Sequence, residues 1–250
     1  MIALRACAKL TRFLEVTGRR DDGYHELRSE MATIDLVDLL VLDEDADYLT
    51  VFNPFEPAVP ADATNLVARA LRLVGRTAGV VIEKSIPVGG GLGGGSADAA
   101  AILRWAGGVS AQEALSLGGD VPFCQVGGRA LVEGVGERLT PLAFEARDVT
   151  LFFAPFGVST AECYRAYDEM RVGGWRPSGT NHLEEPAGAV EPRLASSLAW
   201  LRAEIGPQVQ LAGSGSTMFV EGHLDGSRRG WDMTGPDGIL RVSQTITTPT

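Results

Sequence analysis

Apolar positions along the chain follow two patterns, one typical of strands and one typical of helices. Runs rich in β-branched and aliphatic residues at 36–42, 79–86 and 149–154 predict buried strands. Residues 64–74 instead place apolar side chains at nearly the helical period, and Gly75 is a suitable stop. Further strands are predicted at 1–16, 129–132, 209–212 and 217–221, and further helices at 97–106, 110–117, 159–170 and 196–205. This mixture indicates an α+β or α/β fold.

Polar and turn-forming residues separate these segments. Residues 17–25 predict a polar loop, and the Pro- and Gly-rich stretch 172–193 predicts a second one. The residues after 221 are rich in glycine and polar side chains and specify no element strongly. A new strand–helix unit begins near residue 147, so we expect two domains, 1–147 and 148–250.

The composition narrows the class of protein. The chain has 250 residues and a formal net charge of −10, which disfavours binding to nucleic acids or anionic membranes. No apolar run approaches the ~20 residues of a membrane span. Cys7, Cys124 and Cys163 are widely spaced, which predicts small buried side chains and not a disulfide or zinc framework. These features lead us to expect a cytoplasmic protein.

One segment points to chemistry, the glycine loop Pro-Val-Gly-Gly-Gly-Leu-Gly-Gly-Gly-Ser-Ala at 87–97, which a predicted helix follows. A flexible linker would alternate glycine with serine over a longer stretch and would not adjoin a strand and a helix. Glycine lets backbone N–H groups approach a ligand, and the start of a helix adds unpaired N–H groups and partial positive charge. Together these features form a phosphate cradle, which needs no basic surface and therefore suits an acidic protein.

Other phosphate-binding loops fit this segment less well. Residues 89–94 match the dinucleotide pattern GxGxxG, but residues 83–85 are polar where a buried parallel strand should be apolar. The Walker A pattern ends in Gly-Lys-Ser/Thr, whereas here Gly95 directly precedes Ser96. The sequence also lacks the protein-kinase motifs VAIK, HRD and DFG. Positive charge for a phosphate must therefore come from elsewhere in the chain.

The glycine loop resembles the phosphate-binding motif of the GHMP kinase superfamily, which includes galactokinase, homoserine kinase and mevalonate kinase. Five further blocks resemble, in the same order, motifs of one family within it, the 4-diphosphocytidyl-2-C-methyl-D-erythritol kinases. These blocks are 8–10 with 13–16 and 18–27, then 64–67, 117–123, 134–139 and 212–216. Six blocks in order, from residue 8 to about 221, make the resemblance specific.

The resemblance implies the two-domain α+β GHMP kinase fold, an N-terminal α/β domain with a mixed sheet and a C-terminal ferredoxin-like α+β domain. It also implies ATP-dependent phosphorylation, at the 2-hydroxyl, of a polyol linked to cytidine diphosphate. In this family Asp120 corresponds to the catalytic base, and Lys9 to the cation that keeps it ionised and stabilises the transferring phosphoryl group. From the residues alone, Asp120 is equally suited to cap a short helix that has Pro122 in its first turn, and Lys9 to lie in solvent on a strand.

The resemblance further implies where ATP and Mg²⁺ bind. ATP phosphates would contact the glycine loop, Pro87, Val88, Gly89, Gly90, Gly91, Leu92, Gly93, Gly94, Gly95, Ser96 and Ala97. Ser96 would hold phosphate or Mg²⁺ through its hydroxyl or cap the following helix, and both roles can hold at once. Asn65 would contact adenine or cap its own helix, and Lys84 would border the adenine or remain a solvated strand lysine.

The acceptor side of the site follows in the same way. Tyr24 and His25 would hold the cytidine, because tyrosine stacks on a flat base and histidine hydrogen-bonds a pyrimidine edge. Tyr164 and Tyr167 would stack on its other side or pack in the core. The remaining acceptor residues implied are Thr11, Gly213, Ser214, Gly215 and Ser216, of which the last four otherwise form a tight hairpin.

Some positions depart from the family pattern. Thr11 stands where the family usually has asparagine, Arg12 where it is typically apolar, and His182 where it often has aspartate. The stretch 222–226 does not resemble the usual closing helix. These departures keep open a GHMP kinase for another small alcohol, and a nucleotide-binding homologue with little catalysis also remains possible. The partner expected is a small molecule, with no nucleic acid and no membrane, and the chain a monomer or weak homodimer.

Overall fold

The computed structural model describes residues 1–55, 57–224 and 230–249. Its N-terminal part is built on a six-stranded mixed sheet in which two long strands, β1 (Ile2–Arg19) and β2 (His25–Asp43), form an antiparallel pair. The other edge of β2 pairs with two strands in succession. Its first half pairs with β5 (Arg129–Gly134) and its second half with β4 (Gly79–Glu83). The outer strands are β3 (Tyr48–Phe52), parallel to β4, and β6 (Arg138–Pro141), antiparallel to β5.

The predicted loop at 17–25 is shorter than expected. Both strands extend into it, with Arg19 paired to His25, and only residues 20–24 turn. Two backbone hydrogen bonds, Arg20 N to Tyr24 O at 2.8 Å and Gly23 N to Arg20 O at 3.0 Å, close this turn. Ladder hydrogen bonds do not depend on side-chain polarity, so a strand can continue through polar residues that face solvent.

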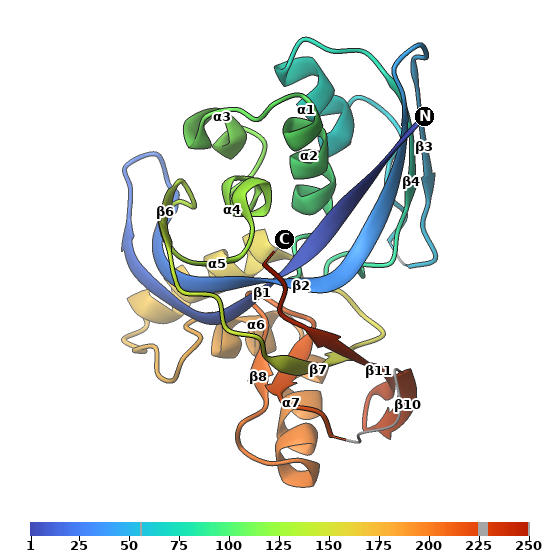
Figure 1. Ribbon diagram of the computed structural model, residues 1–250. Helices are drawn as coiled ribbons and strands as arrows, with labels where there is room; N and C mark the ends of the chain where they lie inside the picture. The colour runs from blue at the N-terminus through green and yellow to red at the C-terminus, as the bar shows by residue number, and fades with distance from the viewer. Residues whose placement is uncertain (56, 225–229, 250) are drawn as a thin grey trace.

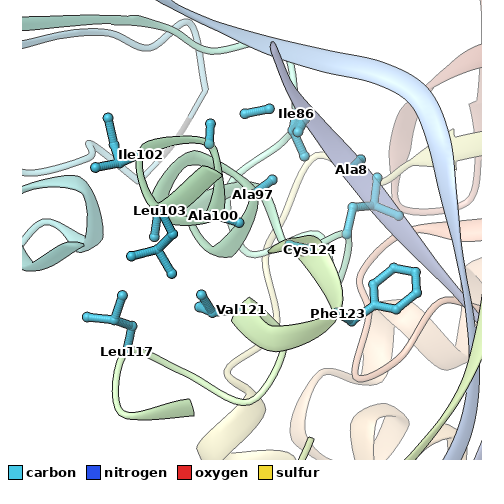
Figure 2. Close-up of a cluster of buried hydrophobic side chains, with 14 of the residues drawn as sticks. Ala8, Ile86, Ala97, Ala100, Ile102, Leu103, Leu117, Val121, Phe123 and Cys124 are labelled. Carbon is cyan, nitrogen blue, oxygen red and sulfur yellow. The ribbon is translucent and has the colours of Figure 1, made fainter. Parts of the chain in front are cut away.

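Four helices cover one face of this sheet, as Figure 1 shows. They are α1 (Leu66–Leu73), α2 (Gly94–Trp105), α3 (Ala111–Leu115) and α4 (Val121–Val126). The predicted Ser110–Glu113 capping box opens α3. Between the helices, Figure 2 shows Ala100 and Leu103 of α2 close to Val121 of α4, and all three are buried. Phe123 of α4 is also buried and points toward the strand that carries Ala8. The small alanines let α2 pack tightly, which fixes the start of this helix.

The C-terminal part pairs a five-stranded antiparallel sheet, in the order β10-β11-β7-β9-β8, with three helices. Its elements are β7 (Asp148–Phe153), α5 (Thr160–Val172), α6 (Glu184–Val190), α7 (Pro192–Glu204), β8 (Gln210–Leu211), β9 (Met218–Glu221), β10 (Gly230–Gly235) and β11 (Gly238–Ile246). A second buried cluster, which includes Phe152, Leu198 and Met218, fills the space between this sheet and its helices. The α+β fold class is thereby confirmed.

One prediction in this part was wrong, and a segment that the sequence left unassigned contains two strands. The stretch 172–193 contains α6 and the start of α7, because Pro186 lies in the first turn of α6 and Pro192 is the first residue of α7, where proline is tolerated. The residues after 221 include β10 and β11, which complete the sheet beside β7. Part of the unusual stretch 222–226 lies outside the described residues.

The two parts touch at several places. Leu14 N donates to Thr180 O at 2.9 Å, and Thr248 N donates to Thr33 O at 2.9 Å. Because β7 begins at Asp148, we propose to keep the division into domains at 147/148. Within the described residues, no helix is long and apolar enough to span a bilayer.

Candidate active site

Two cavities meet at Asp120. The larger, about 1090 Å³, is lined by the turn at Tyr24 and His25 and by α5, and the smaller, about 470 Å³, by the glycine loop, Asn65 and Lys84. Six residues line both cavities, namely Leu27, Met31, Ser96, Asp120, Thr160 and Tyr164. A group transferred between ligands in the two cavities would therefore pass beside Asp120 and Ser96.

The glycine loop is held from outside by its carbonyl groups. Gly89 O accepts from Val158 N and Ser216 N, Gly90 O accepts from Thr217 N at 3.1 Å, and Leu92 O accepts from Lys9 N at 3.0 Å. Within the part of the chain that the structure describes, no N–H group from Gly89 to Ser96 donates a hydrogen bond. A run of unpaired N–H groups that lines a cavity is suited to an anion.

Three glycines of this loop, Gly89, Gly91 and Gly93, have left-handed backbones, and close packing adds a second constraint at the last two. Gly91 has φ 75°, and a Cβ there would stand 2.3 Å from Ala212 O. Gly93 has φ 70° and directly precedes α2. A Cβ at Gly91 would clash with the backbone of the 212–215 loop, and one at Gly93 would press on the side chain of Lys9.

The helix after the loop starts earlier than predicted. It begins at Gly94, and its N-cap residue is Gly93, so the interpretation that Ser96 caps the helix is wrong. Glycine at these positions allows the helix to begin inside the loop, and tight packing of the alanines holds it there. Ser96 instead lies in the first turn, where its hydroxyl makes no hydrogen bond with any described residue and lines both cavities. Pro87, Val88, Leu92 and Gly95 also line the smaller cavity, whereas Ala97 is buried in the core.

Lys9 and Asp120 come together as the resemblance implied. Lys9 Nζ lies 3.4 Å from Asp120 Oδ2, and the lysine is buried while the aspartate is partly exposed. Asp120 does occupy the N-cap position of α4, but its side chain accepts no capping hydrogen bond. The carboxylate is therefore available to a ligand, with a buried cation beside it.

Residues on the acceptor side surround Lys9. Its Nζ donates to Thr11 Oγ1 at 2.9 Å, so the threonine positions the lysine. Gly213 lies against both, since a Cβ there would stand 3.4 Å from Lys9 Nζ and 3.6 Å from Thr11 Oγ1. Ser214 lines the smaller cavity and its hydroxyl bonds to that of Thr160 at 2.8 Å.

The rest of the 213–216 loop has a structural role. It connects β8 to β9 as a hairpin, as the alternative reading expected. Gly215 packs beneath Leu211 and Leu194, and Ser216 donates its hydroxyl to Phe156 O. Neither residue lines the two cavities.

Lys84 lies in a buried ionic cluster at the back of the smaller cavity. Its Nζ contacts Asp38 and lies 2.6 Å from Asp98 Oδ2. Asp38 Oδ1 in turn accepts from Ser85 N at 2.5 Å and Ile86 N at 2.8 Å, immediately before the glycine loop. The cluster thus joins the residues before the loop to helix α2 behind it.

The electrostatics of this cluster are unusual. Burial raises the pKa of Asp98 to about 7, because Lys84 only partly offsets the burial and the neighbouring Asp38 adds to it. Burial alone would lower the pKa of Lys84, but Asp98 and Asp38 outweigh it and raise that pKa. Asp98 Oδ1 is buried without a hydrogen-bond partner among the described residues. One lysine therefore neutralises two carboxylates incompletely.

Asn65 also has defined partners. Its side chain caps α1 by accepting from Val67 N at 2.9 Å, and its amide donates to Pro60 O at 2.7 Å. It lines the smaller cavity with Ala58, Val59 and Leu66, which form an apolar wall suited to a flat base. Asn65 therefore caps α1, and its contact with adenine stays a proposal.

Aromatic side chains shape the larger cavity. Tyr24 is exposed at its rim, and His25 stacks on Tyr164 with ring centroids 4.7 Å apart. Tyr167 is buried against Leu14 and Leu183, so it belongs to the core and does not line the cavity. Burial, together with nearby Asp120, raises the pKa of Tyr164, which keeps this phenol neutral.

The departures from the family pattern have local explanations. Arg12 forms ion pairs with Glu30 and Glu221 and thereby joins β1 to β2 and β9, outside both cavities. His182 Nδ1 accepts from Val16 N at 3.0 Å, which fixes the chain beside β1. Neither residue changes the groups around Lys9 and Asp120.

Sequence reasoning missed the charged partners of Lys84 and His25. Asp38 was detectable, because a lone aspartate within the apolar run 36–42 indicates a buried charge that needs a partner. Asp98, which pairs with Lys84, and Asp168, which contacts His25, gave no such signal, since both lie on helices and their partners are distant in sequence.

The comparisons with known proteins agree with this geometry. The family model described as GHMP kinases N terminal domain matches residues 63–128, which hold the glycine loop and Asp120. A crystal structure of 4-(cytidine 5'-diphospho)-2C-methyl-D-erythritol kinase is 32% identical, with a TM-score of 0.71, over 99% of this chain and 100% of that one. The structure of L. major mevalonate kinase shares the fold at 14% identity and a TM-score of 0.61, over 100% of this chain and 97% of that one.

Curated relatives carry the same name as the first of these structures. The 4-diphosphocytidyl-2-C-methyl-D-erythritol kinase of Paracoccus denitrificans (strain Pd 1222) is 39% identical over 231 residues, 86% of this chain and 84% of that protein. That of Dechloromonas aromatica (strain RCB) is 36% identical over 237 residues, 86% of each chain. The chain therefore belongs to the GHMP kinase superfamily and, within it, to the family of 4-diphosphocytidyl-2-C-methyl-D-erythritol kinases.

Proposed function

We propose that this chain transfers the γ-phosphoryl group of ATP to the 2-hydroxyl of 4-diphosphocytidyl-2-C-methyl-D-erythritol, in non-mevalonate isoprenoid biosynthesis. The observation that carries the proposal is the position of Asp120, which lines both cavities and pairs with Lys9. The nucleotide would occupy the smaller cavity and the acceptor the larger one. The activity of the named relatives supports this choice of substrates.

Asp120 would act on the acceptor hydroxyl. Its carboxylate orients the alcohol and accepts the hydroxyl proton as the oxygen bonds to the γ-phosphorus. The bond between that phosphorus and the β,γ-bridging oxygen breaks, and ADP leaves with the electron pair. Lys9, 3.4 Å from Asp120, would offset the negative charge of the carboxylate and of the transferring group.

The glycine loop would hold the ATP phosphates through the unpaired N–H groups of Gly89 to Ser96. This arrangement positions the γ-phosphate near Asp120 without a basic surface, in keeping with the acidic chain. Pro87, Val88 and the apolar wall beside Asn65 would enclose the nucleoside. Lys84 would serve the site indirectly, by fixing the loop, because both carboxylates of its cluster already surround its ammonium.

Mg²⁺ fits the residues present. Magnesium usually takes one or two protein oxygens and completes its shell with phosphate and water. Ser96 offers an unpaired hydroxyl at the junction of the two cavities, so it would hold the ion. Bound there, Mg²⁺ would neutralise phosphate charge.

The acceptor would be bound at both of its ends. Tyr24 and His25 would hold the cytidine in the larger cavity. The polyol would extend past Asp120 to the edge of the smaller cavity, where Gly213, Ser214 and Thr11 would border it next to Lys9. The free thiols of Cys7, Cys124 and Cys163 suit a reducing, cytoplasmic setting. For assembly, a monomer or weak homodimer remains the proposal.

A coupled ADP-release assay tests this function directly. With ATP and Mg²⁺, the purified chain should turn over the cytidyl substrate, while mevalonate, homoserine and galactose give rates near background. Turnover of one of those three alcohols instead would assign a different acceptor. No ADP release with any acceptor, from protein that still binds ATP, would support a binding homologue.

A further inference from the structure

Asp168 of α5 joins two residues of the larger cavity. Its Oδ1 lies 2.8 Å from His25 Nε2, and its Oδ2 lies 3.3 Å from Arg19 Nη1. All three residues line the cavity beside Tyr24. The two oxygens of this carboxylate are thus occupied by different partners.

The contact with Asp168 sets the hydrogen-bonding character of His25. An ionised carboxylate only accepts hydrogen bonds, so the ring proton of a neutral imidazole must be on Nε2. The other ring nitrogen, Nδ1, is then an acceptor, and it has no hydrogen-bond partner among the described residues.

The ring is also fixed in orientation. It stacks on Tyr164 at 4.7 Å with an interplanar angle of 18°, and meets the edge of Tyr167 at 5.9 Å. The aromatic contacts hold the plane of the ring, and a half-turn that keeps this plane would replace Nε2 by a C–H group facing Asp168, so the carboxylate determines which nitrogen faces it.

We propose that Asp168 is a positioning residue that determines base specificity, by holding His25 in the tautomer whose Nδ1 accepts a hydrogen bond from the acceptor's pyrimidine. The inference rests on the proposed function, since it requires a cytidyl acceptor in this cavity. Cytosine carries an exocyclic amine that donates at the position where uracil carries an accepting oxygen. An accepting Nδ1 therefore favours cytosine. With uracil, Nδ1 and the uracil oxygen would be two acceptors facing each other without a proton between them.

Arg19 makes the inference sharply testable. In Asp168→Asn, Arg19 would keep the amide oxygen on its own side, so the amide NH₂ would face His25 Nε2. That nitrogen would then have to accept, and the ring proton would move to Nδ1. The same site would now offer a donor and prefer uracil.

The experiment measures tautomer and base preference separately. At about pH 8, where an ordinary imidazole is uncharged, ¹⁵N NMR of the histidine rings should show His25 protonated on Nε2 in the wild type and on Nδ1 in Asp168→Asn. Calorimetry with cytidine diphosphate and uridine diphosphate should give at least about a tenfold preference for cytidine, reduced or reversed in Asp168→Asn. Asp168→Ala should lose preference without reversal. Glu169→Gln, the exposed neighbour on the same helix, is the matched control and should match wild type.

The outcomes separate the two proposals. Selective binding of cytidine diphosphate without phosphoryl transfer would leave the role of Asp168 intact and remove the proposed reaction. Phosphoryl transfer with an unchanged base preference in a folded Asp168→Asn would overturn the role of Asp168 alone. A wild-type ring protonated on Nδ1, or no binding of either diphosphate, would also overturn it.

Discussion

Gly93 lies directly against Lys9, so that a Cβ on this glycine would stand 3.0 Å from Lys9 Cγ and 3.5 Å from Asp120 Oδ2. The phosphate loop and the Lys9–Asp120 pair are thus in contact, although they come from different parts of the chain. A side chain at Gly93 would meet the groups proposed to carry the reaction, and any movement of the loop would reach them as well.

Gly93→Ala should therefore impair catalysis and stability together. The left-handed backbone at φ 70° costs about 1–2 kcal/mol for a residue with a Cβ, and the new methyl group would displace Lys9. We expect a lower kcat and weaker ATP binding, measured by the ADP-release assay and calorimetry, with a lower midpoint in urea. Gly108→Ala is the control, because Gly108 has φ 83° with nothing within 4 Å of its Cβ position. It should lose stability but keep wild-type kinetics, and equal kinetic losses in both variants would refute the contact argument.

Asp120→Asn should abolish turnover and leave ATP binding nearly intact. The amide keeps the shape of the side chain but cannot accept the hydroxyl proton, so kcat should fall by about 10² or more. The dissociation constant for ATP should stay within about threefold of wild type, since the proposed phosphate contacts are backbone N–H groups. Asp45→Asn, exposed in the turn after β2, should behave like wild type. A full rate in Asp120→Asn would remove this residue from the mechanism.

Site residues were predictable from the sequence where a short local motif determines their position. The glycine loop fixes its own backbone, and Gly118-Gly119-Asp120 places a carboxylate at a turn, so both were assigned from the chain and its resemblance. The role of Lys84 was not predictable in this way. Its partners Asp38 and Asp98 lie on another strand and on a helix, and only the folded chain brings them together.

Helices and strands, too, were predictable where local sequence determines them and were missed where distant pairing does. Helices with strong caps, such as α3, begin where the sequence predicts. The first half of β2 was missed, because it is stabilised by ladder bonds to β1 and β5 and not by an apolar run of its own. The strands after residue 221 were missed for the same reason, since β11 depends on pairing with β7.

Lys84→Met should lower the free energy of unfolding strongly and the affinity for ATP much less. Removing the ammonium leaves Asp38 and Asp98 buried side by side, a loss that typically costs about 3–5 kcal/mol. Urea denaturation should show this loss, and combining Lys84→Met with Asp98→Asn should recover part of it. If Lys84→Met folds too poorly to measure, Asp98→Asn alone should be tolerated, because the lysine keeps Asp38 as its partner. Unchanged stability with much weaker ATP binding would instead make Lys84 a direct ligand of the nucleotide.

Glu30 should make the stability of the chain depend on pH through the ion pairs that join β1, β2 and β5. Burial alone would raise the pKa of Glu30, but Arg129 and Arg12 outweigh it and lower the pKa below its ordinary value. A lowered carboxyl pKa contributes stability above the ordinary pKa, and this contribution is lost as the pH falls through the folded value. Wild type should therefore exceed Glu30→Gln in unfolding free energy at about pH 7, and the difference should shrink toward about pH 3.

Urea denaturation of both proteins across this range measures the effect. Glu15→Gln is the matched control, because Glu15 pairs with Arg28 at 3.2 Å on the surface, where such pairs add little. Its difference from wild type should stay small at every pH. A Glu30→Gln difference that is constant with pH would mean that the carboxylate is not held ionised by Arg12 and Arg129, and that the arginines pair elsewhere in solution.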